Sequence, residues 1–480
     1  MARRLAGTLT GNREKSVMYP NPSCAAATAT LAATIAALFS TAPHAADQQL
    51  DSVVVTATRQ ATRSNELTSD VSVITRAEID QAGESTLAQL LARQPGIQYV
   101  ANGGAGTNSG VFIRGASTNQ SIVLIDGQRI GSATTGSAAL SRIPLDQIER
   151  VEILRGPASS LYGADAIGGV IQIFTRGGEG PTRLNASSGY GSYNTTDTSV
   201  GVAGGTDVVS YSVQAGYLDT DGFNASNNRR NASYNRDRDG YYNKNLSANF
   251  SVRPASGQEI GVNLLVSSGT NRYDANDFSA LGAAQNYSSD QSVGSYSIYS
   301  RNRLHSAWTS TLRLGRSTDA SKDYVGNVRD ATFRTDMDLL SWQNDFRLPV
   351  GEALLAAEYT KQRVSGSTAY TVSERTIGSW LAGWNGNLDK HRLQLNLRRD
   401  NNSQFGGETT GSASYGYQFT PQWRAHIAYG TAFRAPTFNE LYFPASFFFA
   451  GGNPDLKPER ARNTELGVNW EQGGHRASAV

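Results

Sequence analysis

The segment Arg392-Leu-Gln-Leu-Asn-Leu-Arg398 alternates strictly between polar and apolar side chains. Its three leucines share one face, and the arginines, the glutamine and the asparagine share the other. This period of two is the period of a β-strand. Arginines are poor residues for a dry core but suit a wide lumen that holds water or polar groups. The segment therefore predicts a strand of a β-barrel with an apolar exterior.

The same pattern recurs from about residue 182 onward, between loops rich in Asn, Asp, Ser and Gly. In one further segment, one face carries Tyr211, Val213, Ala215 and Tyr217, and the opposite face carries Ser212, Gln214 and Gly216. In another, one face carries Ile427, Tyr429 and Phe433, and the opposite face carries Arg424, His426 and Gly430. At roughly 20 residues per strand and loop, this region holds about 14 or 15 strands. A secreted soluble β-sandwich or propeller is the alternative, although the lack of a fixed repeat argues against a propeller.

The amino-acid composition excludes some classes of function. The chain has 480 residues, of which 18% are charged, and its 43 Lys+Arg nearly balance its 41 Asp+Glu. Nucleic-acid binders usually show a clear basic excess, so we expect no nucleic-acid partner. A single cysteine, Cys24, excludes a disulfide scaffold and a cysteine-ligated metal centre.

Residues 1–46 are predicted to be a secretory signal peptide. Arg3 and Arg4 belong to a basic region, which is followed by an Ala-rich apolar run and then by small residues typical of a cleavage site. Cleavage is expected between Ala45 and Asp47. Met18 is an alternative start. After this segment no run of 18 apolar residues occurs, so the exported chain is either soluble or crosses a membrane as a β-barrel.

Residues from about 50 to 180 predict a mixed α+β domain. Thr75 is expected to cap a short helix, and Pro95-Gly96 to end a second helix that carries a leucine stripe. The expected strands are Val71–Thr75, Val111–Arg114, Ile122–Gly127, Ile148–Leu154 and Gly169–Thr175.

Several motifs resemble TonB-dependent outer-membrane receptors. Phe112–Gly115, Val123–Gly127, Ile148–Pro157 and Leu161–Val170 are similar to the plug domain of that family, and Asp400–Gly406, Ala432–Pro436 and Gly452–Glu459 are similar to its barrel. The motif at 400–406 favours the cobalamin branch over the siderophore branch. The resemblance implies a mainly β protein, a transmembrane antiparallel barrel at 181–480 with an N-terminal α+β plug at 58–180 in its lumen. It also implies 22 strands in a complete protein, so we expect this chain to lack the C-terminal strands and to form no closed barrel alone.

A β-prone segment near the expected N-terminus of the exported chain resembles the Ton box. It consists of Asp51, Ser52, Val53, Val54, Val55, Thr56 and Ala57. Such a segment can add as a strand to the exposed sheet edge of a partner. The implied partner is TonB with its ExbB–ExbD energy complex, and an ordinary first strand is the alternative.

Two Gly- and Ser-rich segments, residues 102–110 and 131–137, are expected to form apical loops of the plug. Small residues let a large flat ligand approach backbone amides. Gly104-x-Gly106 lacks the third glycine of a dinucleotide fingerprint, so nucleotide binding is discounted. By resemblance, the cobalamin-contacting positions are Asn108, Gly110, Ser117, Thr135, Gly136 and Ala275.

Asn235-Arg-Asp-Arg-Asp-Gly240 places oxygen ligands at alternate positions and echoes half of an EF-hand loop. The twelfth position is Leu246 instead of Glu, which excludes an EF-hand. Without the family, a solvated loop is the simpler interpretation. The resemblance implies a calcium site whose candidate ligands are Asn224, Asn235, Asp237, Asp239, Tyr273 and Asp274, with Asp277 or Asp290 as a further acid.

No motif of a hydrolase, metalloprotease or nucleotide-binding enzyme is found, so no enzymatic activity is expected. The resemblance implies active transport of cobalamin across the outer membrane of a Gram-negative bacterium, in contact with membrane lipid and lipopolysaccharide. A receptor for a siderophore or another metal chelate is one alternative, and a passive porin or adhesin is another.

Overall fold

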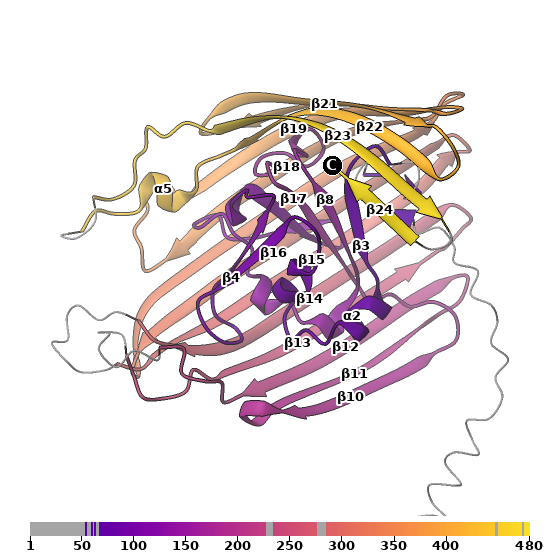
Figure 1. Ribbon diagram of the computed structural model, residues 1–480. Coiled ribbons are helices and arrows are strands. Elements are labelled where there is room, and N and C mark those ends of the chain that lie inside the picture. The colour runs from indigo at the N-terminus through magenta and orange to yellow at the C-terminus, as the bar shows by residue number, and fades with distance from the viewer. Residues whose placement is uncertain are drawn as a thin grey trace, which may run out of the picture. The chain divides into compact units, whose positions relative to one another are not determined.

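In the described part of the chain, fifteen antiparallel strands form one large sheet in which each strand pairs with the next along the chain, from β10 to β24 (Figure 1). Their bounds are β10 (Arg183–Gly191), β11 (Thr195–Gly205), β12 (Val209–Thr220), β13 (Tyr241–Val252), β14 (Gln258–Tyr273), β15 (Tyr287–His305), β16 (Trp308–Val325), β17 (Val328–Arg347), β18 (Glu352–Gly366), β19 (Glu374–Leu388), β20 (His391–Asn402), β21 (Gly406–Gln418), β22 (Trp423–Arg434), β23 (Glu459–Gln472) and β24 (His475–Ala479). The predicted number of strands is confirmed.

The computed structural model describes residues 53–54, 59–60, 62–63, 67–226, 234–275, 285–446, 450–472 and 475–480. Within these ranges no pairing joins β10 to β24. The predicted signal peptide at 1–46 lies outside the described residues. No helix of the described part is both long enough and apolar enough to cross a membrane.

The strands follow the predicted alternation. Leu395 and Leu397 of β20 are exposed on the outer face, whereas Arg398 is buried on the inner face. Phe433 of β22 differs from the expectation, because it is buried with Ala164 instead of facing outward. The pairing of β22 with β21 ends at Gly430, and beyond that point the strand packs against the N-terminal domain.

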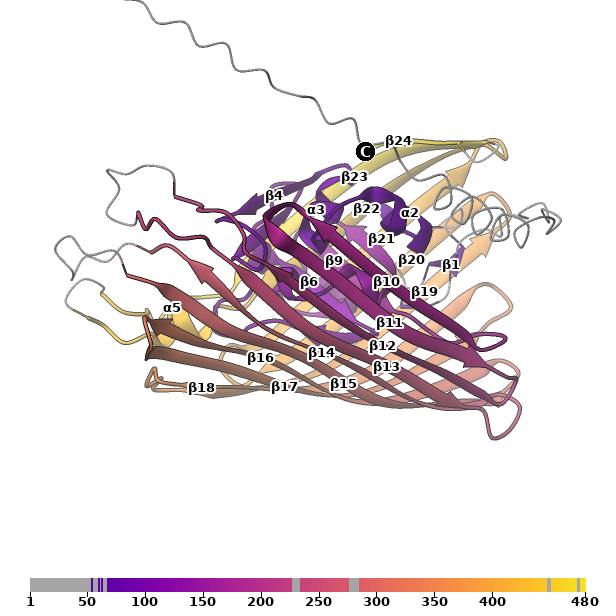
Figure 2. The ribbon, with the colours of Figure 1, turned by 90° about the horizontal axis from the view of Figure 1, so that it is seen from below.

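The N-terminal domain lies inside the curve of the large sheet (Figure 2). Its five-stranded sheet has the order β3-β8-β9-β6-β7. The strands of the domain are β3 (Val71–Ile74), β4 (Ile97–Ala101), β5 (Ser109–Ile113), β6 (Ser121–Ile125), β7 (Gln128–Ile130), β8 (Ile148–Arg155) and β9 (Gly169–Thr175). Alternating isoleucines of β8 and β9, including Ile153 and Ile173, are fully buried in its core.

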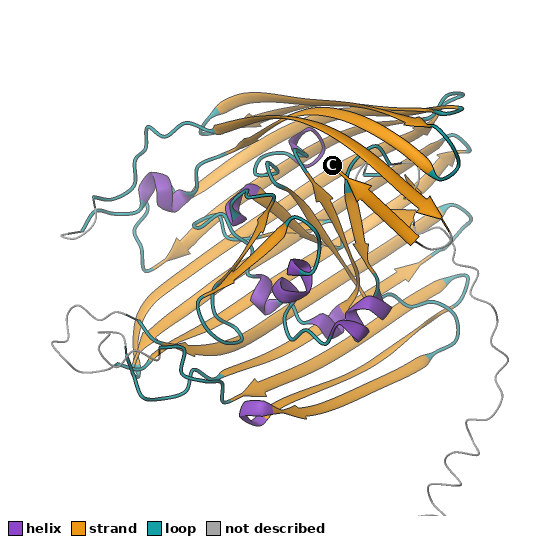
Figure 3. Ribbon diagram, in the orientation of Figure 1, coloured by secondary structure: helices purple, strands orange, loops and turns teal. Residues whose placement is uncertain are grey.

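Short helices cover this domain (Figure 3). They are α2 (Arg76–Ala82), α3 (Leu87–Ala92) and α4 (Ser159–Tyr162), with 3-10 turns η2 (Thr118–Gln120), η3 (Leu140–Arg142) and η4 (Leu145–Gln147). As predicted, Thr75 caps α2, and Glu78 completes a capping box. Outside this domain, η5 (Ser192–Asn194) lies between β10 and β11, and α5 (Phe438–Tyr442) lies between β22 and β23.

Ion pairs tie the domain to the inner face of the large sheet. Arg114 contacts Asp70 of its own domain at 2.5 Å and Glu465 of β23 at 2.6 Å. Arg155 also reaches Asp70, at 3.3 Å. The charged residues of the predicted plug therefore pair with each other and, through Arg114, with the surrounding wall.

Candidate functional site

The two predicted apical loops lie at the end of the molecule where the long connections of the large sheet emerge. Gly110 and Gly136 are close to neighbouring residues of η2, because a Cβ on Gly110 would lie 2.9 Å from the Thr118 hydroxyl and one on Gly136 would lie 2.9 Å from the Asn119 Cβ. Ser117 is exposed immediately before these residues. The structure therefore brings Gly110, Ser117 and Gly136 together.

The other three predicted substrate positions are also at this end. Asn108 and Thr135 are exposed on the same two loops, and Ala275 is half-buried just after β14. Small or polar groups thus border the region, which suits contact through backbone amides.

Arg142 anchors the first apical loop to the wall. Its Nη2 donates to the Gly106 carbonyl and to Asn271 Oδ1, each at 3.0 Å, and its guanidinium lies 5.7 Å from the centre of the Tyr241 ring. Gly106 has a φ of 77°, and any Cβ there would overlap the Tyr241 ring. A glycine is needed at this position both for the backbone conformation and for the close approach.

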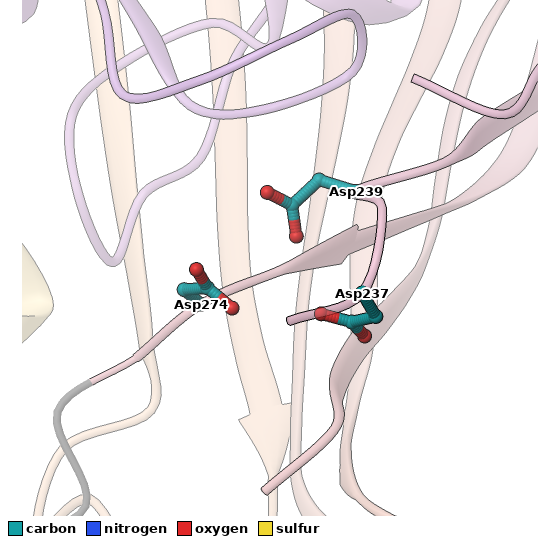
Figure 4. Close-up of side chains that lie close together, drawn as sticks. All are labelled: Asp237, Asp239 and Asp274. Atoms are coloured by element: carbon teal, nitrogen blue, oxygen red, sulfur yellow. The ribbon is translucent and has the colours of Figure 1, made fainter. Parts of the chain in front are cut away.

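Three carboxylates converge beside this loop. Asp237 and Asp239 precede β13 and Asp274 follows β14, and one oxygen from each lies within 4.8 Å of the others. Their carboxylates point into the space between the two segments (Figure 4). Tyr241 pairs with Asn271 across the two strands, so the residues that precede β13 and follow β14 meet at the same end of this strand pair.

The donor set of this acid cluster, Asp237, Asp239 and Asp274, fits a hard divalent cation. Asp237 Oδ1 and Asp274 Oδ2 are buried with no hydrogen-bond partner among the described residues. Burial, together with the charges of Asp239 and Asp237, raises the pKa of Asp274 to about 6. Burial and Asp237 likewise raise the pKa of Asp239, against a hydrogen bond from the Ala225 amide. A bound cation would favour the ionised forms and supply the missing partners.

The other predicted calcium ligands, Asn224, Asn235 and Tyr273, lie around this cluster, but their side chains make other contacts. The side-chain amide of Asn224 donates to the Asn235 carbonyl, and the Asn235 amide donates to Asn286 at 2.6 Å. Tyr273 ends β14 with its ring 5.8 Å from that of Tyr287. Leu246 lies within β13, consistent with the exclusion of an EF-hand.

Of the two further acids, Asp290 is exposed and accepts a hydrogen bond from Thr270, so it does not join the cluster. Asp277 lies outside the described residues. Arg236 and Arg238 are both exposed, and Arg238 pairs with Asp221 at 3.2 Å.

A further wall element, which the sequence patterns did not indicate, contacts the second apical loop. The amides of Phe438 and Asn439 in α5 donate to the carbonyls of Ala133 and Thr134 at 3.0 and 3.3 Å. Phe438 is fully buried. A capping box formed by Thr437 and Glu440 is the local sequence signal for this helix.

At the opposite end, the chain that follows the predicted Ton box is bound to the wall. Val53 and Val54 form β1 (Val53–Val54), which pairs with β2 (Thr62–Arg63). The other Ton-box positions, Asp51, Ser52, Val55, Thr56 and Ala57, lie outside the described residues. Gln60 donates to Asp345 at 2.9 Å and accepts from Asn385 at 3.0 Å.

Arg59 joins three parts of the molecule. It contacts Glu358 of β18 at 2.6 Å and donates to the Leu161 carbonyl at 3.0 Å. Arg398 of β20 contacts the same Glu358 at 2.8 Å. Gly163, which follows α4, has a φ of 85° and leaves room for the Arg398 guanidinium, 3.1 Å from where a Cβ would lie.

Comparison with known proteins identifies this architecture. A family model described as "TonB-dependent Receptor Plug Domain" matches residues 63–170, and one described as "TonB dependent receptor-like, beta-barrel" matches residues 162–480. The chain belongs to the TonB-dependent receptors. Because the two matches overlap, the predicted boundary between 180 and 181 stays a prediction.

Curated relatives of this receptor include vitamin B12 transporters BtuB. The protein from Photobacterium profundum is 32% identical over 429 residues, which cover 88% of this chain and 68% of that protein. The protein from Vibrio vulnificus is 30% identical over 433 residues, with the same two shares.

Solved structures share the fold. The siderophore receptor PirA from Acinetobacter baumannii superposes with a TM-score of 0.69 at 22% identity, over 86% of this chain and 70% of that one. An enterobactin-bound mutant of the ferric enterobactin receptor PfeA from Pseudomonas aeruginosa also gives 0.69, at 21% identity, over 86% and 71%.

Proposed function

We propose that this receptor imports cobalamin or a related corrinoid across the outer membrane by TonB-dependent active transport. The observation that carries the proposal is the 32% identity to a vitamin B12 transporter over 88% of the chain. The exposed apical loops, with Asn108, Gly110, Ser117, Thr135 and Gly136, are the proposed plug side of the site, and Ala275 is the proposed wall side.

Calcium is proposed as the cofactor that orders the site. Asp237, Asp239 and Asp274 would supply carboxylate oxygens, and Asn224, Asn235 and Tyr273 lie next to them as candidate further ligands. The physical support is the pair of buried carboxylate oxygens without partners among the described residues. Phe223 and Ala225 lie against Gly104 and Gly103 of the first apical loop, so a cation that fixes this wall loop would also steady the plug loop.

In the proposed cycle, cargo enters from outside and settles on the apical loops. Binding favours release of the Ton box, residues 51–57, which TonB then grips as an added strand. Binding alone shifts a population and drives no net import, so the ExbB–ExbD complex is the proposed source of energy. The outer face of the sheet is proposed to contact lipid and lipopolysaccharide in the outer membrane of a Gram-negative bacterium.

A metal-chelate receptor, for example for a ferric siderophore, is the second candidate. The solved structures that share the fold include receptors for such chelates. A passive porin or adhesin is a weaker alternative, because a plug domain fills the inner face of the sheet.

The deciding experiment measures cyanocobalamin binding to receptor extracted from its native outer membrane, with calcium and with chelator. We expect binding that weakens on chelation in the wild type and is insensitive to calcium in the double variant Asp237→Ala, Asp239→Ala. Asp221→Ala is the matched control, because Asp221 lies in the same loop but pairs with Arg238. Absence of cyanocobalamin binding by folded receptor in both conditions would reject the corrinoid and favour a siderophore.

A further inference from the structure

A large cavity lies at the opposite end from the apical loops. It has a volume of about 850 Å³ and lies between the plug sheet and the inner face of the wall from β14 to β20. Leu124 and Phe174 form part of its plug side, and Thr309 and Thr311 form part of its wall side. Its lining reaches Gly257, Ser306 and Ala307 at the short turns of the sheet, so we name it the short-turn cavity.

The charge in the short-turn cavity is uneven. Among the described residues, eight arginines and six carboxylates line it. The carboxylates nearest the turns are already engaged: Glu259 binds Arg253 at 3.3 Å and accepts from the Tyr299 hydroxyl at 2.6 Å. Asp345 accepts from Gln60 at 2.9 Å and from Gln343 at 3.2 Å.

Arg301 and Arg303 are neighbouring arginines of β15. Both line the cavity and are exposed to its solvent, and within the described part of the chain neither guanidinium takes part in a hydrogen bond or an ion pair. They are two residues apart on one strand, so they stand about 7 Å apart on the same face. Arg301 faces Glu259 on one side and Thr311 on the other, and Arg303 faces Thr309.

Two neighbouring guanidinium groups make a recognisable kind of site. Each presents a planar fork of donors that matches the oxygens of a phosphate or carboxylate. An anion between them gains from both charges, and the low-dielectric walls of a cavity strengthen the attraction relative to bulk water. A cavity of this volume also lies within the range of small-molecule sites.

We propose that the short-turn cavity is a second binding site, in which Arg301 and Arg303 bind an oxyanion group of the cargo, a phosphodiester or a carboxylate, after it has left the apical loops. The inference rests on the proposed transport function for its cargo, but the site itself is defined by the cavity and by Arg301 and Arg303, whose guanidinium groups form no hydrogen bond or ion pair among the described residues. It assigns this receptor a stopping point between the apical loops and the exit.

The first test uses charged thiol reagents. Thr311→Cys places a thiol in the cavity opposite Arg301, and the sequence's one cysteine, Cys24, lies in the predicted signal peptide. The rate of modification is measured with an anionic (sulfonatoethyl) and a cationic (trimethylammonioethyl) methanethiosulfonate. We expect the anionic reagent to be preferred, and Arg301→Gln with Arg303→Gln to reduce that preference at least about tenfold.

Arg236→Gln with Arg329→Gln is the matched control, because both arginines are exposed near the long-loop end, and it should leave the preference unchanged. A neutral thiol reagent checks that each variant keeps its fold. Protection of the thiol by dimethyl phosphate assigns the site to phosphodiesters, and protection by citrate assigns it to carboxylates. If neither anion protects the thiol, or if the Arg301→Gln, Arg303→Gln variant keeps the preference for the anionic reagent, the proposed site is wrong.

A measurement of uptake in cells tests the cavity site separately from the corrinoid assignment. In cells, Arg301→Gln with Arg303→Gln should slow cyanocobalamin uptake at least about fivefold while surface binding at equilibrium stays unchanged. Unchanged uptake would remove the cavity from the cargo path. If the wild type binds no cyanocobalamin at all, the corrinoid assignment fails, and the reagent and protection measurements alone decide the oxyanion site.

Discussion

Arg59 and Glu358 form a 2.6 Å ion pair that binds the segment behind the predicted Ton box to strand β18 of the wall. Arg398 shares the same carboxylate, and both arginines also donate to the Leu161 carbonyl of the plug. If the proposed Ton box is pulled by its partner, a contact that the wall and the plug hold in common would have to break. This arrangement leads to the first prediction.

Arg59→Gln should release the N-terminal segment without disrupting the plug core. Removal of one partner of a buried pair leaves the other charge uncompensated, although Arg398 still neutralises Glu358 here. We expect a cysteine introduced as Ser52→Cys to be labelled at least about threefold faster in this background, since local release raises exposure. Arg93→Gln is the control, because the ion pair of Arg93 with Glu84 is a long 3.8 Å contact. Equal labelling rates in the two variants would show that the pair does not restrain the segment.

Val54→Pro should abolish uptake while leaving cargo binding intact. Val54 pairs with Thr62 in β1–β2, and strand addition to TonB would need the same backbone donors, which proline lacks. Uptake and surface binding of cyanocobalamin are measured in the same cells, with Val54→Ile as the control. Uptake at the wild-type rate would mean that this segment is an ordinary first strand and is not the coupling element.

Gly106→Ala should weaken cargo binding by roughly tenfold or more, because a strained left-handed alanine would also overlap the Tyr241 ring and displace the apical loop. Gly104→Ala is a close control on the same loop, since its Cβ would meet Phe223 at an ordinary 3.5 Å. Binding isotherms of cyanocobalamin for both variants measure this difference in affinity. Similar affinities in the two would show that the Arg142 anchor does not position the site.

Calcium binding should weaken as the pH falls through about 6. In the absence of metal, burial and the neighbouring acids raise the pKa of Asp274 to about 6, so protons compete with the cation below that value and the competition vanishes above it. Asp274→Asn should lower the calcium affinity at about pH 7.5 and flatten its change between about pH 7.5 and 5.5. Calorimetric titration of both proteins measures this, and parallel pH profiles would exclude Asp274 as a ligand.

Local patterns predicted much of the fold. The period of two in segments such as 392–398 decides which side chains face outward, and Thr75 with Glu78 specifies the start of α2, because both effects depend on residues close in sequence. The pattern failed at Phe433, where packing against Ala164 outweighs the alternation.

The candidate site depends on information that alternation does not carry. The resemblance to the family singled out Asp237, Asp239 and Asp274 as calcium ligands, and only the register of β13 with β14 puts them within 4.8 Å of one another. The Arg59–Glu358 pair joins residues far apart in the chain, as does the contact of α5 with the second apical loop.

By itself, the sequence determined the strand-rich architecture, the separate plug and the residue types available at the two ends of the molecule. These features depend on local periodicity and short motifs, which involve residues close together in the sequence. The tertiary structure alone decided which acids lie together as a candidate cation site and which arginines remain unpaired in the described part of the short-turn cavity. The physical reason is that the partner of a charge is set by strand register and by the docking of plug on wall, and both are properties of the whole fold.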